Sequence, residues 1–142
     1  MSERERFGFP EWQAPLTEYQ RAFERYHANP GSLATTAFLG RAIARLEAAY
    51  RRPGLFELGR VALSDGACEA LVSGKHLAEE FLIRHMHGDW GLAVREDAAL
   101  NRTAVRRAGE VTSRYQTRGE AELWISTRGD RSTTHLFTRD EY

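Results

Sequence analysis

Three segments of alternating apolar and polar residues end the sequence, and their spacing most restricts what the chain can fold into. The segments cover residues 111–116, 122–126 and 132–137. Alternation with a period of two is typical of a β-strand that buries one face. The connections around Gly119 and at 128–131 are short and rich in turn-forming residues. Strands joined by short turns pair antiparallel, so the sequence predicts a three- to four-stranded antiparallel meander at the C-terminus.

The region before the meander carries the periodicity of helices. From Leu16 to Tyr26 the apolar residues recur every three or four positions, and Asn29-Pro30-Gly31 ends that pattern. Ser32 can cap a second helix, which runs to the stop signal Pro53-Gly54. These two segments predict a helical hairpin, and Pro53-Gly54 is the clearest internal boundary of the chain.

Further helices are predicted between the hairpin and the meander. They cover residues 67–72, 77–86 and 96–108. Asp65 is placed to cap the first of them, and Leu100 belongs to the apolar side of the last. Residues 55–63 fit either a strand or a short helix that leads into one. The fold class predicted for the whole chain is therefore α+β.

A chain of 142 residues fits one domain. We predict a single domain over 1–142, made of a helical N-terminal segment (1–53) and an α+β core (54–142). Aromatic side chains before the first helix suit either the core or a dimer interface, so the sequence leaves the oligomeric state open. These side chains are Phe7, Phe9 and Trp12.

Composition argues against several classes of function. A net charge of zero at pH 7 disfavours a DNA mimic and a protein that coats nucleic acid by bulk charge. Cys68 is the only cysteine, which fits a reducing cytoplasm, and no segment approaches the ~18 apolar residues of a membrane span. No Cys–His spacing resembles a zinc site. We expect a cytoplasmic protein with no membrane association, no metal and no cofactor.

His85 is the residue most open to a catalytic interpretation. It lies four residues after Phe81 and three after Leu82, on the apolar side of a predicted helix. A histidine there is a hydrogen-bonded core residue, an acid–base group or, least favoured, a metal ligand. If His85 is an acid–base group, the chain could be a metal-independent ribonuclease, by analogy with small bacterial toxin nucleases that also place helices before a meander. Its catalytic groups would be His85, Arg114, Arg131, Ser132, Thr134 and His135. Residues 128–132 equally fit a polar turn in which Asp130 bonds to its own backbone.

Other polar and aromatic residues are candidates for binding. Arg114 and Trp124 occupy the polar sides of neighbouring predicted strands. If these sides coincide, the two residues form a cationic and aromatic surface that can hold a nucleotide. If helices cover that face of the sheet, Trp124 belongs to the core. Asp89 and Trp90 form either an anchored turn after a helix or part of a binding surface.

Four arginines follow one predicted helix and form a basic stripe. They are Arg95, Arg102, Arg106 and Arg107. Spacings of seven and four place the first three on one side of the helix. Such a stripe can bind the phosphates of a nucleic acid, with an affinity that falls steeply with salt. A solvated helix face has the same pattern.

Three motifs follow one another in residues 55–142. They are Leu55-Phe56-Glu57-Leu58-Gly59-Arg60-Val61, Arg84-His85 with Gly88-Asp89-Trp90-Gly91, and Asp130-Arg131-Ser132 with Thr134. In these motifs the chain resembles a family of short bacterial proteins that are often carried on plasmids, phages or integrative elements. It departs from the family pattern at Ser64-Asp65-Gly66, where the family has a Pro-Gly turn, and at Leu136-Phe137, where the family has a Leu-Pro pair. The helical N-terminal segment lies outside the resemblance.

The resemblance implies an accessory protein of a mobile genetic element. Such a protein would act by binding a host protein or a nucleoprotein complex, for example in counter-defence. The added helical segment and the lack of a complete catalytic signature favour binding without turnover. A metal-independent ribonuclease and a nucleic-acid-binding protein are the alternatives, so the sequence does not decide whether the chain is an enzyme.

Overall fold

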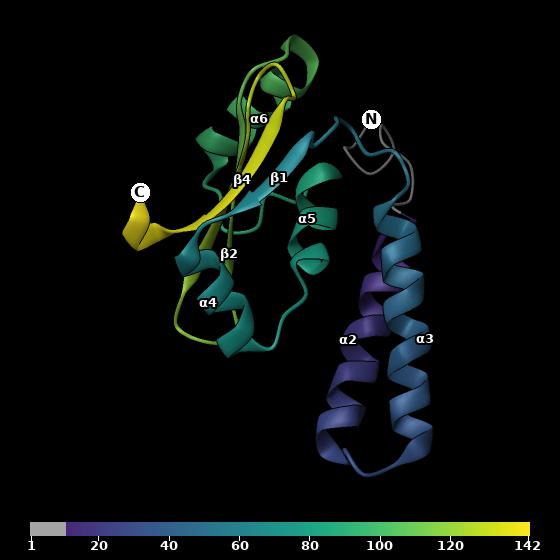
Figure 1. Cartoon of the computed structure of the whole chain (residues 1–142). Coiled ribbons are helices and arrows are strands. Elements are labelled where there is room, and N and C mark those ends of the chain that lie inside the picture. Colours follow the sequence, from purple (N-terminus) through teal and green to yellow (C-terminus); the bar gives the residue numbers. More distant parts are fainter. Residues whose placement is uncertain (1–10) are drawn as a thin grey trace. The chain divides into compact units, whose positions relative to one another are not determined.

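The computed structural model describes residues 11–142, and the chain divides into two compact units (Figure 1). The first unit is Met1–Arg52 and the second is Pro53–Tyr142. The division falls beside Pro53-Gly54, where the proline ring and the bare glycine backbone disfavour a continued helix. Among residues 11–142, no helix has the length and hydrophobicity that crossing a bilayer requires.

The first unit contains the predicted helical hairpin. Its helices are α2 (Gln13–Ala28) and α3 (Leu33–Tyr50). The hydroxyl of Ser32 accepts a hydrogen bond from the N–H of Thr35 at 3.3 Å, which confirms the predicted cap of α3. The two helices pack along their lengths. Trp12 is buried, whereas Phe7 and Phe9 lie outside the described residues.

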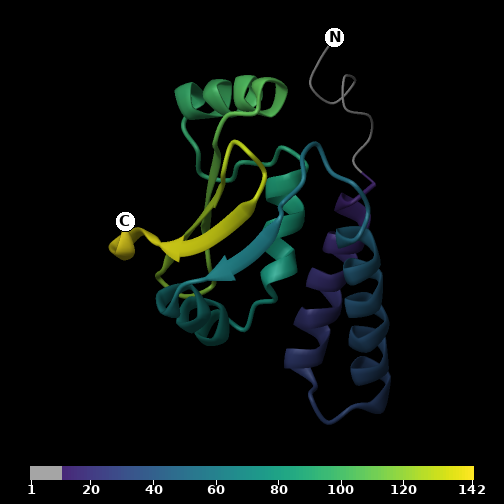
Figure 2. The ribbon, with the colours of Figure 1, turned by 45° about the horizontal axis from the view of Figure 1, so that its top comes forward.

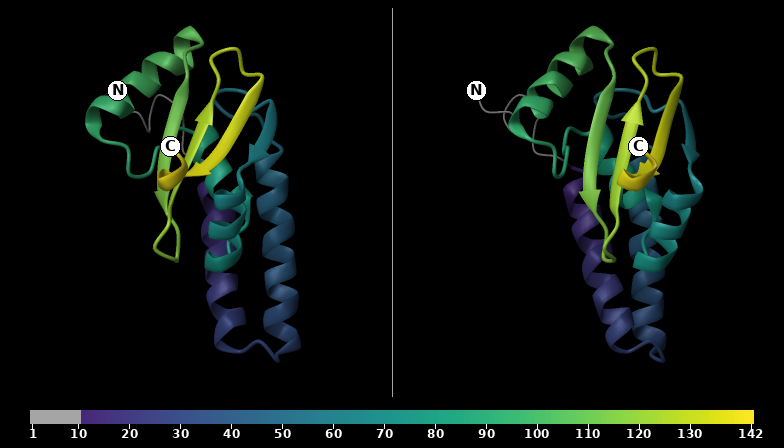
Figure 3. Two further views of the ribbon diagram at one scale, coloured as in Figure 1. Left: turned by 60° about the vertical axis from the view of Figure 1, so that its left-hand side comes forward. Right: turned by 90° about the vertical axis from the view of Figure 1, so that its left-hand side faces the viewer.

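The second unit contains a four-stranded mixed sheet with the order β1-β4-β3-β2 (Figure 3). The strands are β1 (Arg60–Leu63), β2 (Val111–Gln116), β3 (Glu122–Thr127) and β4 (Thr133–Thr138). Strands β2, β3 and β4 form the predicted antiparallel meander. Strand β1 pairs with β4 in parallel, so the expectation of a purely antiparallel sheet is wrong. Parallel neighbours need a long crossover, and here it runs through three helices and two strands, which no local turn signal reveals.

Three helices of the second unit follow β1. They are α4 (Asp65–Gly74), α5 (Ala78–Met86) and α6 (Arg95–Arg107). The hydroxyl of Ser64 caps α4 by accepting a hydrogen bond from the N–H of Ala67 at 3.0 Å. The prediction that Asp65 is the cap is therefore wrong by one residue. Asp65 instead places its carboxylate in the first turn, where the helix dipole favours negative charge.

The two faces of the sheet differ in what covers them. Helix α5 lies against one face of the sheet (Figure 2 and Figure 3). Along β2 and β3, buried side chains that point to this face alternate with more exposed side chains that point to the other face. The buried inward side chains are Val111, Ser113, Tyr115, Leu123, Ile125, Thr127, Thr134 and Leu136. Within residues 53–142, no α-helix covers the opposite face, and only the short helical turn η1 (Arg139–Glu141) lies across it (Figure 3, right).

Helix α6 packs beside the edge strand β2 instead of on a sheet face. The side-chain amide of Asn101 donates to the carbonyl of Thr112 at 2.7 Å and accepts from its N–H at 3.1 Å. This amide replaces a neighbouring strand for one residue of the edge. Asn101 and Ala104 are the buried residues of α6, and Leu100 is 68% exposed. Leu100 was predicted on the packed side, and that prediction is wrong because one polar anchor sets the rotation of the helix.

Candidate functional site

His85 lies at the centre of a buried chain of hydrogen bonds. Its Nδ1 atom is 2.5 Å from the hydroxyl of Ser113, and its Nε2 atom is 2.8 Å from the hydroxyl of Thr127. The hydroxyls of Thr127 and Thr134 are 2.7 Å apart, and Thr134 donates to the carbonyl of Leu58 at 2.7 Å. The four side chains that make these hydrogen bonds are fully buried. The hydrogen bonds join α5 to β2, β3, β4 and the segment before β1.

The carbonyl of Leu58 fixes the direction of every hydrogen bond in this chain. A carbonyl can only accept, so the Thr134 hydroxyl must receive its other bond from Thr127. The Thr127 hydroxyl must then receive its bond from the Nε2–H of His85, which leaves Nδ1 to accept from Ser113. Burial, followed by the positive charge of Arg131, lowers the pKa of His85 to about 3. His85 is therefore a neutral core residue whose ring nitrogens are both occupied.

Only some of the groups proposed for a ribonuclease lie together: His85 and Thr134 share the buried hydrogen-bonded chain, whereas Arg114 and His135 lie on the opposite face of the sheet. Thr134 is buried beneath the sheet, whereas His135, the next residue of β4, is exposed on the opposite face. His85 and His135 therefore cannot act on one phosphate from two sides. The hydroxyl and N–H of Ser132 donate to Asp130 at 2.6 and 3.0 Å, as expected for a polar turn.

Arg131 is occupied by the end of helix α6. Its guanidinium donates to the carbonyl of Ala104 at 2.8 Å and to that of Gly109 at 2.6 Å. It also lies over the ring of Phe56, with 5.2 Å between the guanidinium carbon and the ring centroid. A cation at the C-terminal end of a helix stabilises the last carbonyl groups. These contacts give Arg131 a structural role, in place of the catalytic role it would have in a ribonuclease.

Two glycines of the motifs lie directly against the backbone of other segments. Gly59 has φ of 65°, and a side chain there would collide with the carbonyl of Arg131 in the third motif. Gly91 also has φ of 65°, and a side chain there would collide with the carbonyl of Arg114 in β2. The motif residues thus pack the sheet, the turns and α5 together. Five residues of the motifs are buried in the core: Phe56, Leu58, His85, Trp90 and Thr134.

Of the two alternatives for Asp89 and Trp90, an anchored turn after a helix or part of a binding surface, the structure has the anchored turn. The Asp89 carboxylate accepts from Arg84 Nε at 2.7 Å and from the N–H of Gly91 at 3.1 Å. The hydroxyl of Tyr115 donates to the carbonyl of Asp89 at 2.6 Å. Trp90 is 8% exposed, so its ring fills the core. Both residues, proposed for binding, hold the chain that leaves α5.

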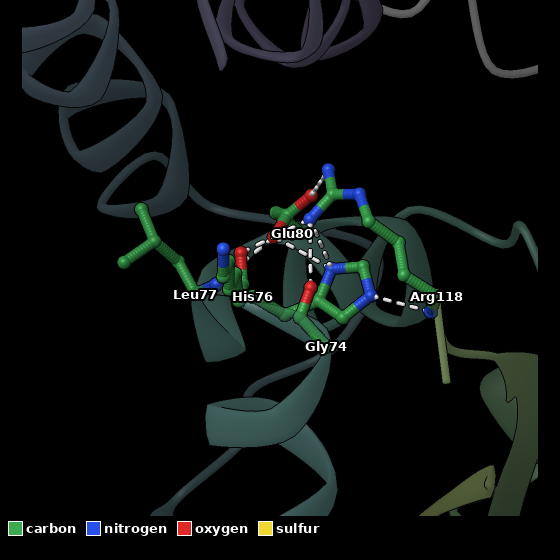
Figure 4. A network of polar contacts seen from close by, with 6 residues as sticks. Gly74, His76, Leu77, Glu80 and Arg118 are labelled. Atoms are coloured by element: carbon green, nitrogen blue, oxygen red, sulfur yellow. Dashed lines mark hydrogen bonds and ion pairs between the residues drawn. The ribbon is translucent and has the colours of Figure 1, made fainter. Parts of the chain in front are cut away.

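A second polar cluster joins the β2–β3 loop to the turn between α4 and α5 (Figure 4). The backbone N–H of Arg118 donates to His76 Nε2 at 2.9 Å, so Nδ1 carries the proton and donates to Glu80 at 3.0 Å. The N–H of Leu77 donates to the same carboxylate oxygen at 2.9 Å. The guanidinium of Arg118 donates to the carbonyls of Gly74 and Lys75 at 3.1 and 3.0 Å.

This cluster is structural because both ring nitrogens of His76 have partners. Sequence reasoning missed it. The spacing of four between His76 and Glu80 on a helix start was a usable signal. The participation of Arg118, 42 residues after His76, had no signal in the sequence.

The uncovered face of the sheet carries a cluster of aromatic rings beside an arginine. Arg114 on β2 pairs in register with Trp124 on β3, and the guanidinium carbon lies 5.5 Å from the Trp124 ring centroid. Phe137 lies opposite Trp124 on β4, with 6.0 Å between centroids. His135 and Tyr142 are 5.5 and 6.2 Å from Phe137. We call these five residues the aromatic face. The condition set by the sequence, that Arg114 and Trp124 share a side, is met.

The charge on the aromatic face is nearly balanced. The carboxylate of Glu122 lies 3.6 Å from Arg114 Nε and 3.8 Å from Arg139 Nη1. It also accepts a hydrogen bond from the indole N–H of Trp124 at 3.1 Å, which fixes the orientation of that ring. The guanidinium of Arg114 donates to the carbonyl of Leu92 at 2.8 Å. The Trp124 ring is thus held in one orientation by Glu122, and a fixed ring loses little entropy when a ligand packs on it.

The basic stripe on α6 is interrupted. Arg95, Arg106 and Arg107 are exposed, but Arg102 is half-buried and engaged with the rest of the chain. The first turn of α6 also holds acidic residues, which offset the charge of Arg95. The stripe therefore offers less free positive charge than the sequence pattern suggests.

Comparison of the chain with known protein families, with curated proteins and with solved structures gave no match. Among residues 11–142, no group of three or more His, Cys, Asp and Glu side chains is placed to hold a metal ion. The aromatic face is therefore the site from which a function can be argued.

Proposed function

We propose that this protein acts by binding a partner, without turnover, and that the aromatic face is its binding surface. The observation that supports this is the Arg114–Trp124–Phe137 row on a sheet face that no α-helix of residues 53–142 covers. Fixed rings and one arginine at the centre of a surface are the usual anchors of a binding site. The acid–base candidate His85, by contrast, is buried and fully hydrogen-bonded.

The proposed biological setting is the bacterial cytoplasm, in the service of a mobile genetic element. The motifs in residues 55–142 support this setting, as does the exposed single thiol of Cys68, which would stay reduced there. The partner is a host protein or a nucleoprotein complex, and counter-defence is the role that such a partner would serve.

Retention of a partner from bacterial lysate tests the proposal. Tagged full-length protein and the variant Trp124→Ala are compared, and each lysate is used with and without nuclease. Removing the central ring should abolish retention of the partner, because this ring contacts Arg114, Phe137 and Tyr142.

The matched control is Val72→Ala, which shortens an apolar side chain that is 78% exposed on α4. It should retain the same species as the wild type, and circular dichroism should show all three proteins folded. Equal retention by Trp124→Ala and Val72→Ala would remove the aromatic face as the binding surface.

A further inference from the structure

We infer that the aromatic face takes an unpaired base of a single-stranded nucleic acid, stacked on Trp124 and Phe137 in the place of the Tyr142 ring. This inference rests on the proposed function and names the chemical class of the ligand. It explains both rows of side chains that cross the open face of the sheet.

The first row already accommodates a flat ring. The Tyr142 ring lies 4.9 Å from that of Trp124 and stacks on Phe137 at 6.2 Å with an interplanar angle of 17°. Tyr142 is nevertheless 87% exposed, so a small part of its surface is held by these contacts. A nucleobase has the same flat aromatic surface with a larger area, and stacking on protein rings is tolerant of its sequence. The base can therefore replace the Tyr142 ring without rebuilding the site.

The second row supplies groups that can bond to the edge of a base. Strand register aligns Thr112, Ser126 and His135 across β2, β3 and β4, next to the aromatic row and on the same face. The hydroxyls of Thr112 and Ser126 are 3.3 Å apart, and Ser126 donates to the carboxylate of Glu110 at 2.8 Å, so a base would have to share these hydroxyls with Glu110. His135 is exposed. Hydroxyl and imidazole groups both donate and accept, as the polar edge of an unpaired base requires.

The charges around the face fit a ligand held mainly by its bases. Arg139 is 70% exposed, and Arg60 is exposed at the start of β1, beside Thr133 on β4. Each of these two arginines can contact a phosphate if Arg139 gives up its 3.8 Å contact with Glu122, which then keeps Arg114 as its partner at 3.6 Å. Two phosphate contacts on a single strand give a log–log salt slope of about −1.4. A duplex hides the faces of its bases, so it cannot stack on Trp124.

Tryptophan fluorescence and anisotropy with short labelled oligonucleotides test the inference on the full chain. Single-stranded RNA and DNA should quench the emission, because Trp124 is half-exposed while Trp12 and Trp90 are 7% and 8% exposed. The same sequence as a duplex should bind at least about tenfold more weakly. Trp124→Leu should weaken single-strand binding about tenfold or more, and Trp124→Phe should keep most of it.

Two further variants separate the inference from its rivals. Tyr142→Ala removes an exposed competing ring, so it should tighten binding of the single strand; weaker binding would overturn the displacement. Arg95→Glu with Arg106→Glu changes the exposed arginines of the α6 stripe and should leave affinity unchanged. Loss of binding in this double variant, or equal affinity for duplex and single strand, would overturn the inference in favour of phosphate binding.

Failure of the inference can be told apart from failure of the proposed function. If no single strand binds but retention of a lysate protein still depends on Trp124, the ligand class is wrong and the aromatic face is a protein-binding surface. If neither oligonucleotide binding nor lysate retention depends on Trp124, both proposals fail. Should Trp124→Leu not fold, the quenching of wild-type Trp124 and the Tyr142→Ala variant still decide the outcome.

Discussion

At the scale of single residues, His85 shows how burial decides the role of a titratable group. Its nitrogens contact only hydroxyl groups, and its pKa falls from the ordinary 6.5 to about 3 because burial disfavours the charged ring. In the unfolded chain the ring takes up a proton below pH 6.5. The folded protein does not bind that proton until the pH approaches 3. The contribution of His85 to stability is therefore complete above pH 6.5 and is lost as the pH falls towards 3.

Because of His85, we expect the free energy of unfolding to be about 2 kcal/mol smaller at pH 5 than at pH 7. Urea unfolding followed by circular dichroism at the two pH values measures the difference. His135→Gln should keep it, because that imidazole is exposed. In His85→Gln the drop between the two pH values should shrink to what the other groups contribute. An unchanged drop in that variant would mean that the buried imidazole is not its source.

At the scale of elements, helix α4 begins where two hydrogen-bond networks meet. The hydroxyl of Ser64 accepts from the N–H of Ala67 and donates to the carboxylate of Glu141 at 2.6 Å. The same carboxylate accepts from the N–H of Gly66 and from Thr138. These bonds, that of Ser64 first, lower the pKa of Glu141 to about 2. The turn η1 is thus tied to the N-terminus of α4, which helps to place Tyr142 beside Trp124 and Phe137.

Ser64→Ala should lower the free energy of unfolding by about 1 kcal/mol, the usual cost of losing a helix cap. Asp65→Ala removes only a favourable charge in the first turn and should cost a few tenths of a kcal/mol, roughly the lower end of dipole effects. Denaturant unfolding of the two variants at pH 7 compares them directly. A larger effect for Asp65→Ala than for Ser64→Ala would contradict the assignment of the cap.

At the scale of the whole molecule, the chain is organised as two units that each have their own buried residues. The second unit, Pro53–Tyr142, holds the sheet, helices α4 to α6, the His85 chain and the aromatic face. Its hydrogen-bonded chain closes from Leu58 to Thr134 without any residue of the first unit. A unit with its own core can fold by itself.

We therefore expect a fragment of residues 53–142 to unfold cooperatively in urea and to keep near-ultraviolet circular dichroism from the buried Trp90 and Tyr115. The pH dependence assigned to His85 should persist in this fragment. A fragment with far-ultraviolet signal but no cooperative transition would show that residues 1–52 are required for the fold of the second unit.

Local signals in the sequence determined most of the elements and several of their ends. Alternation gave the three strands of the meander, and Ser32 and Pro53-Gly54 bounded helix α3, because caps and breakers act on the few residues around them. The sequence also indicated that His85 could be a core residue, because it lies on the same side of its helix as Phe81 and Leu82. These features depend on interactions between residues a few positions apart, so the sequence alone is enough to predict them.

Only the tertiary structure decided which residues meet. The parallel pairing of β1 with β4 and the contact of Arg118 with His76 join segments far apart in the chain, where pairing depends on total packing. The rotation of α6 depends on Asn101 reaching the edge of β2. The aromatic face depends on one register and on the absence of a covering α-helix within residues 53–142. Period-two alternation says that Trp124 and Leu123 point to opposite faces, but the fold decides which face stays open.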